Sequence, residues 1–198
     1  MTAPTIPERK AVLRREIRAW LRALPAANRA DSSTQLREAL TGLDLWRHAR
    51  AVMLFFPLPD EPDIAPLVEA ALAGGKVVCL PRLDPGGAMY SPAQITDPAR
   101  DLIASDFGVL APRESCAAHP GKQLDLTLVP GLGFTENGWR LGRGKGHYDR
   151  MLPRVGGAKC GICFDGQVVA EMPAEPHDIR LDCILTPTRF IPVGSARV

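Results

Sequence analysis

A run of alternating glycine and basic residues, RLGRGKGHYDR at positions 140–150, has the composition of an anion-binding site. Glycine lets successive backbone N–H groups surround an anion, and the start of a following helix adds partial positive charge. Arg143 and Lys145 bring full positive charges to the same place, and Arg140 can add a third. A flexible linker would carry serine and small polar residues instead. We therefore expect this run to bind phosphate, the alternative being a surface loop with solvated cations.

The run does not match the standard nucleotide-binding motifs. The dinucleotide fingerprint GxGxxG would need glycine at position 147, which is His147. The P-loop pattern, GxxxxGK followed by Ser or Thr, is absent. The spacing alone therefore leaves the phosphate compound unidentified.

Two aspartates are candidate ligands for a magnesium ion that bridges phosphate groups. Asp149 lies in a short helix expected from Tyr148 to about Leu152, and Asp182 precedes the apolar segment CILTP. Mg²⁺ prefers carboxylate and water oxygens. As an alternative, Asp149 could be a carboxylate favoured by the helix dipole, and Asp182 could be structural.

The elements that must position this run begin with predicted helices. Apolar residues recur at helical spacing over 7–24, with arginines between them. Further helices are expected at about 28–41 and 44–50. Residues 1–50 hold ten Arg or Lys against five Asp or Glu, so this basic segment could bind nucleic acid. A solvated helix face is the alternative, and it is favoured because aromatic residues are not interleaved with the charges.

From residue 51 onward, buried strands are predicted to alternate with helices. The first two strands flank a helix with Pro66 in its first turn and Gly74 at its end, which predicts a right-handed β-α-β unit with parallel strands. Residues 84–123 are expected to hold loops and small strands. The predicted strands are 51–59, 76–83, 124–134, 158–164 and 181–187. This pattern predicts a layered α/β fold with a mainly parallel central sheet flanked by helices, and the glycine run lies where ligands of such sheets bind.

Length and composition predict a single domain, and the cytoplasm is the expected compartment. The 198 residues are 45% hydrophobic and 23% charged, enough for one core, with N-terminal helices at about 7–50 and an α/β core at about 51–191. The sequence contains no run of eighteen apolar residues, so no membrane span is predicted. The first residues lack the apolar core of a signal peptide.

The five cysteines do not suggest a disulfide framework. Their number is odd and most lie in apolar runs. Cys160 and Cys163 have the spacing of a zinc or redox pair. In a strand, however, residues three apart point to opposite faces, so buried structural thiols are expected.

The segment VPGLGFTENGWRLGRGKGHYDR resembles the signature of 5-formyltetrahydrofolate cyclo-ligases, also called methenyltetrahydrofolate synthetases. The resemblance covers nearly the whole chain. It includes Lys10 and Arg14 in the first helix, FFPLPDEPDIAPLVEAALAGGKVVCLPRL, DFGVLAPRE and FDGQVVAEMPAEPHDIRLDCILTP.

This resemblance implies an ATP-dependent cyclisation of 5-formyltetrahydrofolate to 5,10-methenyltetrahydrofolate that releases ADP and phosphate. It implies that Arg143 and Lys145 are catalytic, that Asp149 and Asp182 hold Mg²⁺, and that the folate contacts Phe56, Glu61 and Tyr148. The residues that would bind ATP are Lys10, Arg14, Arg140, Gly142, Arg143, Gly144, Lys145, Gly146, His147 and Tyr148.

Some positions depart from the family pattern. His147 stands where the family usually has an aromatic residue, which predicts weaker or pH-sensitive packing against a substrate. The segment Tyr90-Ser91-Pro92 lacks the tryptophan often found nearby. His177, beside Asp178, is a candidate for catalysis or for ordering its loop.

Two alternatives to the cyclo-ligase hypothesis stay open at this point. One is a divergent relative with an ATP site and a different or lost substrate, and the other is a nucleic-acid-binding module. We expect small-molecule substrates, no nucleic-acid or membrane partner, and a monomer.

Overall fold

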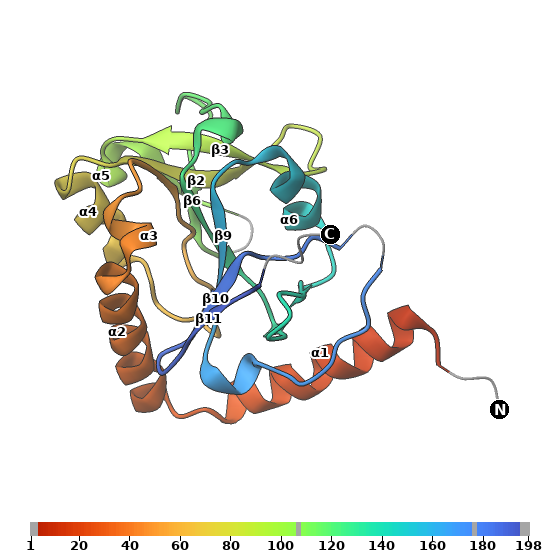
Figure 1. Ribbon diagram of the computed structural model, residues 1–198. Helices are drawn as coiled ribbons and strands as arrows, with labels where there is room; N and C mark the ends of the chain where they lie inside the picture. The colour runs from red at the N-terminus through yellow and green to blue at the C-terminus, as the bar shows by residue number, and fades with distance from the viewer. Residues whose placement is uncertain (1–3, 106–107, 176–177, 195–198) are drawn as a thin grey trace.

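A seven-stranded sheet lies at the centre of the computed structural model, which describes residues 4–105, 108–175 and 178–194 (Figure 1). In spatial order its strands are β11 (Phe190–Pro192), β10 (Cys183–Leu185), β9 (Ala158–Ile162), β6 (Leu126–Pro130), β1 (Ala51–Met53), β2 (Val77–Leu83) and β3 (Tyr90–Ile95). The inner strands β10, β9, β6, β1 and β2 are parallel, whereas β3 and β11 are antiparallel to their neighbours. The expected α/β fold with a mainly parallel sheet is therefore confirmed.

The first β-α-β unit forms as the sequence predicts. β1 and β2 are parallel neighbours, and Ala51 pairs with Val77. They are joined by α4 (Pro66–Ala73), in whose first turn a proline costs no helical hydrogen bond. Gly74 then caps the helix, and its N–H still bonds back to a helical carbonyl oxygen.

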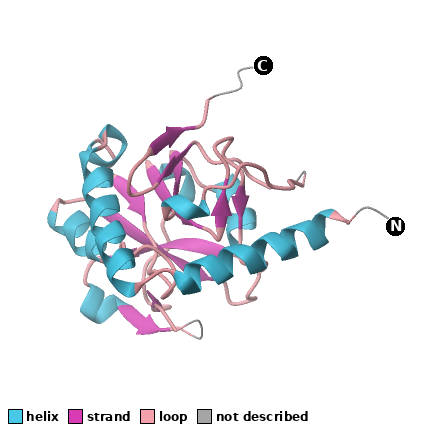
Figure 2. Ribbon diagram, turned by 90° about the horizontal axis from the view of Figure 1, so that it is seen from below, coloured by secondary structure: helices cyan, strands magenta, loops and turns pink. Residues whose placement is uncertain are grey.

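Helices cover both faces of the sheet (Figures 1 and 2). The other helices are α1 (Ile6–Ala23), α2 (Ala26–Gly42), α3 (Asp44–Arg47), α5 (Pro98–Asp101) and α6 (His147–Met151), with 3-10 helices at Gly121–Gln123, Leu152–Arg154 and Asp165–Gln167. Buried residues of α2, α3 and α4 pack on one face in the largest hydrophobic cluster. Met151, Leu152 and Val155 pack on the other face. α1 forms a third cluster, in which Ile17 and Leu21 pack with Leu132, Leu141 and Phe164.

Small strands complete the fold. β4 (Leu102–Ala104) pairs with β5 (Leu110–Pro112) in the region 84–123, where small strands were expected. β7 (Gly133–Phe134) pairs with β8 (Arg140–Leu141), and these two strands were not expected as a separate pair. The edge strand β11 was not predicted, because it is three residues long, ends in proline and buries none of its residues fully. The run at 51–59 is a strand only over its first three residues, and the rest continues beyond the sheet.

The cysteines are structural, as expected. All five are buried free thiols. Cys160 belongs to the cluster on one face of the sheet and Cys163 to the cluster on the other, so the pair cannot hold one metal ion together. Burial raises the pKa of Cys79 to about 12. In the part of the chain that the structure describes, no group of three His, Cys, Asp or Glu residues could hold a metal ion.

Within residues 4–105, 108–175 and 178–194, no helix is both long enough and apolar enough to cross a bilayer.

Asp125 links the start of β6 to the start of β1. Its Oδ2 accepts hydrogen bonds from the N–H groups of Arg50 (2.7 Å) and Ala51 (2.9 Å). These bonds favour the carboxylate, with that from Ala51 contributing most, and they lower the pKa of Asp125. The lowered pKa means that the stabilisation is complete above the unfolded-state pKa and is lost as the pH falls through the folded-state pKa.

We predict that Asp125→Ala lowers the free energy of unfolding by about 1 kcal/mol at pH 7, a modest amount because the side chain is exposed. The difference should shrink on acidification below about pH 4. Urea unfolding at pH 7 and at pH 3 measures both values, with the exposed Glu38→Ala as control. An equal difference at both pH values would contradict the assigned role of the carboxylate.

Candidate functional site

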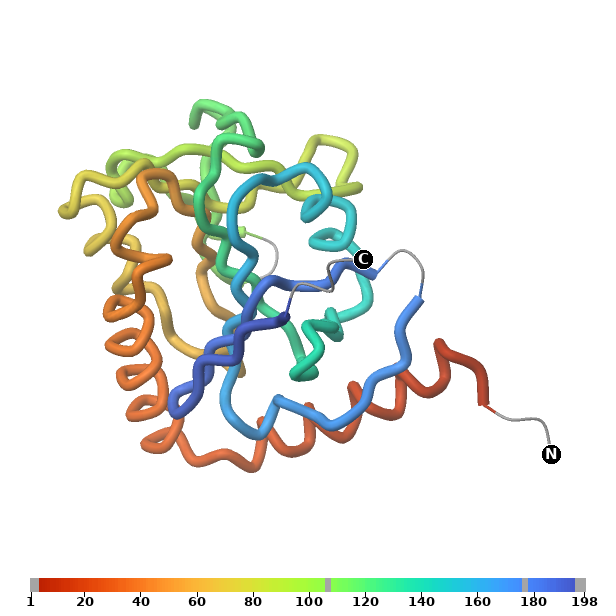
Figure 3. Tube along the Cα trace, in the orientation of Figure 1, coloured from red at the N-terminus to blue at the C-terminus, as the bar shows by residue number. Residues whose placement is uncertain are grey.

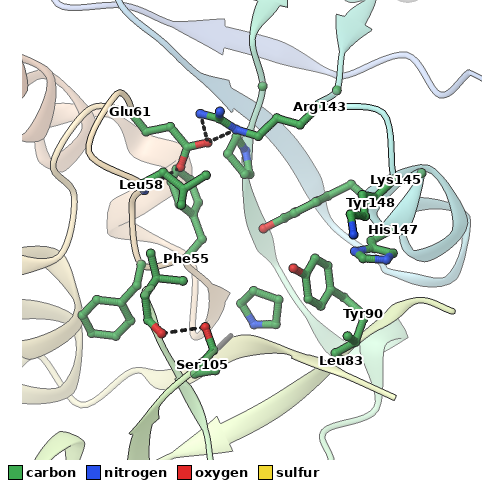
Figure 4. A pocket seen from close by; sticks show the side chains of 18 of the residues that line it. Phe55, Leu58, Glu61, Leu83, Tyr90, Ser105, Arg143, Lys145, His147 and Tyr148 are labelled. Carbon is green, nitrogen blue, oxygen red and sulfur yellow. Dashed lines mark hydrogen bonds and ion pairs between the residues drawn. The ribbon is translucent and has the colours of Figure 1, made fainter. Parts of the chain in front are cut away.

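A pocket of about 350 Å³ opens at the C-terminal edge of the sheet, beyond β1, β2 and β6 (Figure 4). Five segments line it: the loop after β1, the β2–β3 hairpin, the β4–β5 hairpin, the end of β6 at Pro130 and Gly131, and the glycine-rich residues 140–149. The location agrees with the general position of ligands in parallel sheets. It also confirms that the glycine run lies at this edge.

One wall of the pocket is apolar. The loop after β1 contributes Phe55, Phe56 and Leu58, and Pro81, Leu83, Val109 and Leu110 come from the two hairpins. Phe55 is buried, whereas Phe56 is half-buried. A wall of this composition suits a flat organic ring system, because such rings bury much apolar area against aromatic and aliphatic side chains.

The opposite wall is the glycine-rich stretch, in which β8 and α6 are joined by residues 142–146. Gly144 and Gly146 have φ values of 108° and 68°, a region in which other residues are strained. A Cβ on Gly146 would also lie 2.7 Å from Nη1 of Arg150. Glycine is therefore favoured at both positions by backbone shape, and at position 146 the Arg150 guanidinium occupies the space beside it.

Arg140 links the glycine-rich wall to the end of β6 through hydrogen bonds. Its side chain is almost fully buried, and its guanidinium donates to the Pro130 carbonyl oxygen (3.2 Å) and to Oδ1 of Asp149. The guanidinium carbon lies 5.5 Å from the centre of the Tyr148 ring. Arg140 thus connects the end of β6 with the first turn of α6, and it holds Asp149 at the pocket.

Arg143 forms ion pairs with two carboxylates in the loop after β1, Asp60 and Glu61. Figure 4 shows the pair with Glu61. Nε and Nη2 of Arg143 lie 3.1 and 3.0 Å from Oε1 of Glu61, and its Nη1 and Nη2 donate to Asp60. Glu61 is buried, and its Oε2 accepts from the Leu58 N–H at 2.9 Å. Burial raises the pKa of Glu61, although Arg143 and the Leu58 N–H oppose this rise. The sequence interpretation did not include Asp60, although a carboxylate next to Glu61 was a visible signal.

Three aromatic rings pack together beside the glycine-rich stretch (Figure 4). The Tyr90 ring packs edge-on against His147, with centroids 5.1 Å apart, and against Tyr148 at 5.4 Å. Burial raises the pKa of Tyr148 well above its usual value. Burial, followed by the charges of Arg150 and Lys145, lowers the pKa of His147. The sequence singled out Tyr90 only within the Tyr90-Ser91-Pro92 segment that departs from the family pattern, and the structure places it in the pocket lining.

The two basic residues expected from the first helix have different surroundings. Arg14 reaches the glycine stretch, and its Nε donates to the Gly142 carbonyl oxygen at 2.9 Å. Lys10 does not line the pocket; its buried Nζ lies 2.8 Å from Oε2 of Glu175 and 2.7 Å from Oδ2 of Asp178. Burial alone would lower the pKa of Lys10, but its pairs with Asp178 and Glu175 raise it. These pairs tie α1 to the segment that runs alongside it (Figure 3).

The two predicted magnesium ligands do not lie together. Asp149 lines the pocket. Asp182 immediately precedes β10, so it lies at the N-terminal edge of the parallel strands, away from the pocket. Its Oδ2 accepts a hydrogen bond from the Lys159 N–H at 2.7 Å. The expectation that both aspartates hold one ion is therefore corrected: they lie at opposite edges of the sheet, and of the two only Asp149 lines the pocket.

The remaining predicted residues are distributed as follows. Phe56, Glu61, Gly142, Lys145, Gly146, His147 and Tyr148 line the pocket, and Gly144 belongs to the same stretch. His177, and Phe107 of the segment DFGVLAPRE, lie outside the described residues.

Comparisons with known proteins point to one family. Residues 6–187 match the model of the 5-formyltetrahydrofolate cyclo-ligase family. The 5-formyltetrahydrofolate cyclo-ligase of Mus musculus is 30% identical, over 93% of this chain and 97% of the relative. The protein of the same name from Mycolicibacterium smegmatis is 32% identical, with the same coverage of both chains.

Solved structures agree with these relatives. The NMR structure of Aquifex aeolicus 5,10-methenyltetrahydrofolate synthetase superimposes with a TM-score of 0.85 and 30% identity, covering 96% of this chain and 95% of that one. A 5,10-methenyltetrahydrofolate synthetase from Mycoplasma pneumoniae has a TM-score of 0.72 at 21% identity, over 90% of this chain and 98% of that one, and supports the fold.

We predict that Arg140→Met lowers the free energy of unfolding by about 2–4 kcal/mol, because it leaves the half-buried Asp149 carboxylate without its guanidinium partner. Urea unfolding monitored by fluorescence measures the change. Arg47→Met is the matched control, since Arg47 is exposed and lies 3.9 Å from an exposed Asp44, so its loss should cost less than about 0.5 kcal/mol. Equal losses in the two variants would contradict the supporting role of Arg140.

Proposed function

The chain belongs to the 5-formyltetrahydrofolate cyclo-ligase family, and we propose that its pocket at the C-terminal edge of the sheet is where ATP and 5-formyltetrahydrofolate meet. The family is an ATP-dependent ligase that converts 5-formyltetrahydrofolate to 5,10-methenyltetrahydrofolate. One observation carries the proposal: an apolar wall and a basic, glycine-rich wall face each other across one pocket. These walls match the chemistry of a folate ring system and of a triphosphate.

The reaction needs both substrates at one point. A formamide oxygen is a poor leaving group, so the γ-phosphoryl group of ATP is transferred to the formyl oxygen and ADP is released. N10 then attacks the activated carbon and loses its proton to solvent or to the departing phosphate, and the C–O bond breaks as phosphate leaves and the five-membered ring closes. The first step requires positioning and neutralisation of charge rather than acid–base chemistry by side chains.

We assign the glycine-rich wall to the phosphates of ATP. Arg143, Lys145 and backbone N–H groups are donors of the kind that stabilises a transferring phosphoryl group. Arg143 is paired with Asp60 and Glu61, so an incoming phosphate must share or replace these partners. Arg14 contributes by holding the Gly142 carbonyl, whereas a direct contact of Lys10 with ATP stays a prediction that its two ion pairs do not favour.

We assign the apolar wall to the folate. Phe56 offers a ring face for packing, and Glu61 places a buried carboxylate beside it that can accept hydrogen bonds from ring N–H groups. Tyr148 lies between this wall and the glycine stretch, at the boundary where the formyl group and the γ-phosphate would meet.

We also propose that Mg²⁺ enters the pocket with ATP. Mg²⁺ keeps several water ligands and needs only one or two carboxylates besides phosphate oxygens, so a single Asp149 beside the glycine stretch fits this role. When bound, the ion would neutralise phosphate charge and help to orient the group that is transferred. Asp182 has no part in this site, because it lies at the other edge of the sheet.

The remaining expectations about the setting of the enzyme stay predictions. Five buried free thiols fit a reducing compartment such as the cytoplasm. A single domain, a monomeric state and the lack of nucleic-acid binding are likewise predictions. A divergent relative with another substrate would keep the glycine-rich wall but would not form the methenyl product from 5-formyltetrahydrofolate.

The test of the function is the near-ultraviolet absorbance of the methenyl product. We expect absorbance to rise only when Mg-ATP and 5-formyltetrahydrofolate are both present. Lys145→Ala should lower kcat/KM by at least about 100-fold, because it removes a cation from the phosphate wall. The exposed Lys122→Ala serves as control and should retain activity. No product from a folded wild-type enzyme would refute the function, and full activity of Lys145→Ala would remove Lys145 from the mechanism.

The magnesium assignment is tested by comparing two conservative variants in the same assay. We predict that Asp149→Asn raises the Mg²⁺ concentration needed for half-maximal rate by about tenfold or more, since it removes a charged oxygen ligand. Asp182→Asn should leave this requirement unchanged, because its oxygen accepts the Lys159 N–H far from the pocket. A shift in Asp182→Asn, or none in Asp149→Asn, would reverse the assignment.

A further inference from the structure

Arg150 hydrogen-bonds the glycine-rich stretch from outside the pocket. Its Nη2 donates to the Lys145 carbonyl oxygen at 2.8 Å, and its Nε donates to the Ala88 carbonyl oxygen at 2.6 Å. Ala88 lies in the turn between β2 and β3, which sits beside α6 (Figure 1). One guanidinium therefore joins this turn to the stretch that we assign to the phosphates of ATP.

The bond to the Lys145 carbonyl has a direct geometric consequence. In a trans peptide the C=O and the following N–H point in opposite directions, and the described chain contains no cis peptide. Because Arg150 holds the Lys145 C=O, the Gly146 N–H is turned away from Arg150. Lys145 and Gly146 both line the pocket, whereas Arg150 is not among the described residues that line it.

A second arginine, Arg14, also hydrogen-bonds a backbone carbonyl oxygen of this stretch. Nε of Arg14 donates to the Gly142 carbonyl oxygen at 2.9 Å, which fixes the peptide between Gly142 and Arg143. At the other end of the stretch, the Arg150 guanidinium lies close to Gly146: a Cβ at that position would be 2.7 Å from Nη1 of Arg150. The close approach of Arg150 thus depends on glycine at position 146.

We infer that Arg150 is a positioning residue for nucleotide binding, which fixes the Lys145–Gly146 peptide so that the Gly146 N–H is available to a phosphate oxygen. This inference rests on the proposed role of the pocket as the ATP site. Arg150 acts through hydrogen-bond geometry rather than through its charge. Two separate carbonyl oxygens need the fork of a guanidinium, which a lysine ammonium does not reproduce.

The experiment compares Arg150→Met and Arg150→Lys with wild type by calorimetric titration of Mg-ATP and, separately, of 5-formyltetrahydrofolate. We expect both variants to bind Mg-ATP about tenfold more weakly, the loss of roughly one oriented hydrogen bond to a charged group. Binding of 5-formyltetrahydrofolate should stay within about twofold of wild type. Arg154→Met is the matched control, an exposed arginine one turn further on, and should bind both ligands normally.

Each other outcome overturns the inference in a recognisable way. If Arg150→Lys binds Mg-ATP as wild type does, charge alone is sufficient and the guanidinium geometry is irrelevant. If both ligands weaken equally, or if Arg154→Met weakens Mg-ATP to the same extent, the effect is a general loss of structure. Failure of the wild-type protein to bind Mg-ATP would refute the proposed function itself, and that result is visible before any variant is compared.

Discussion

The shape of the glycine-rich stretch depends on guanidinium groups that hydrogen-bond the backbone around it. Glycines at 142, 144 and 146 have no side chains to pack, and two of them adopt left-handed conformations that chain entropy disfavours. Arg14 and Arg150 hold carbonyl oxygens within the stretch, and Arg140 holds the Pro130 carbonyl at the end of the preceding strand. These groups come from α1, α6 and β8, so the fold must assemble before the stretch can have one conformation.

This dependence gives α1 a role beyond the packing of its apolar face. Arg14 reaches the stretch, while Lys10 is buried between Glu175 and Asp178 and fixes the position of the helix. Two residues of the basic N-terminal segment therefore have partners inside the protein. The positive charge that suggested a polyanion surface is in part structural, which weakens the nucleic-acid alternative.

Features that are contiguous in sequence could be predicted, whereas pairs that meet only in the fold could not. The glycine stretch and the first β-α-β unit are each formed by one short contiguous segment of the sequence. Arg143 and Glu61 are 82 positions apart, and Arg14 and Gly142 are 128 apart, so no local pattern reveals that they meet. The same reason hid the contact of Arg150 with Ala88, which are 62 positions apart.

Two errors have a different origin. Asp182 was assigned to the pocket although it precedes a strand that is parallel to the others, and residues before such strands lie at the opposite edge from residues after them. Strand direction was therefore enough to exclude it. β11 was missed because a three-residue edge strand without buried positions leaves no hydrophobic pattern to detect.

The charges at the pocket also bear on how a triphosphate can be bound. Arg140, Arg143 and Lys145 face three carboxylates in the same region, Asp60, Glu61 and Asp149, so formal charges within this group cancel. A site with balanced charge does not offset several negative charges on its own, because desolvated anions need compensating cations. A divalent cation arriving with the nucleotide supplies that compensation, and it gives the Asp149 carboxylate a partner of opposite charge on the pocket side. The ion pairs of Arg143 with Asp60 and Glu61 also keep these groups ordered before the phosphates arrive, so that less side-chain entropy is lost on binding.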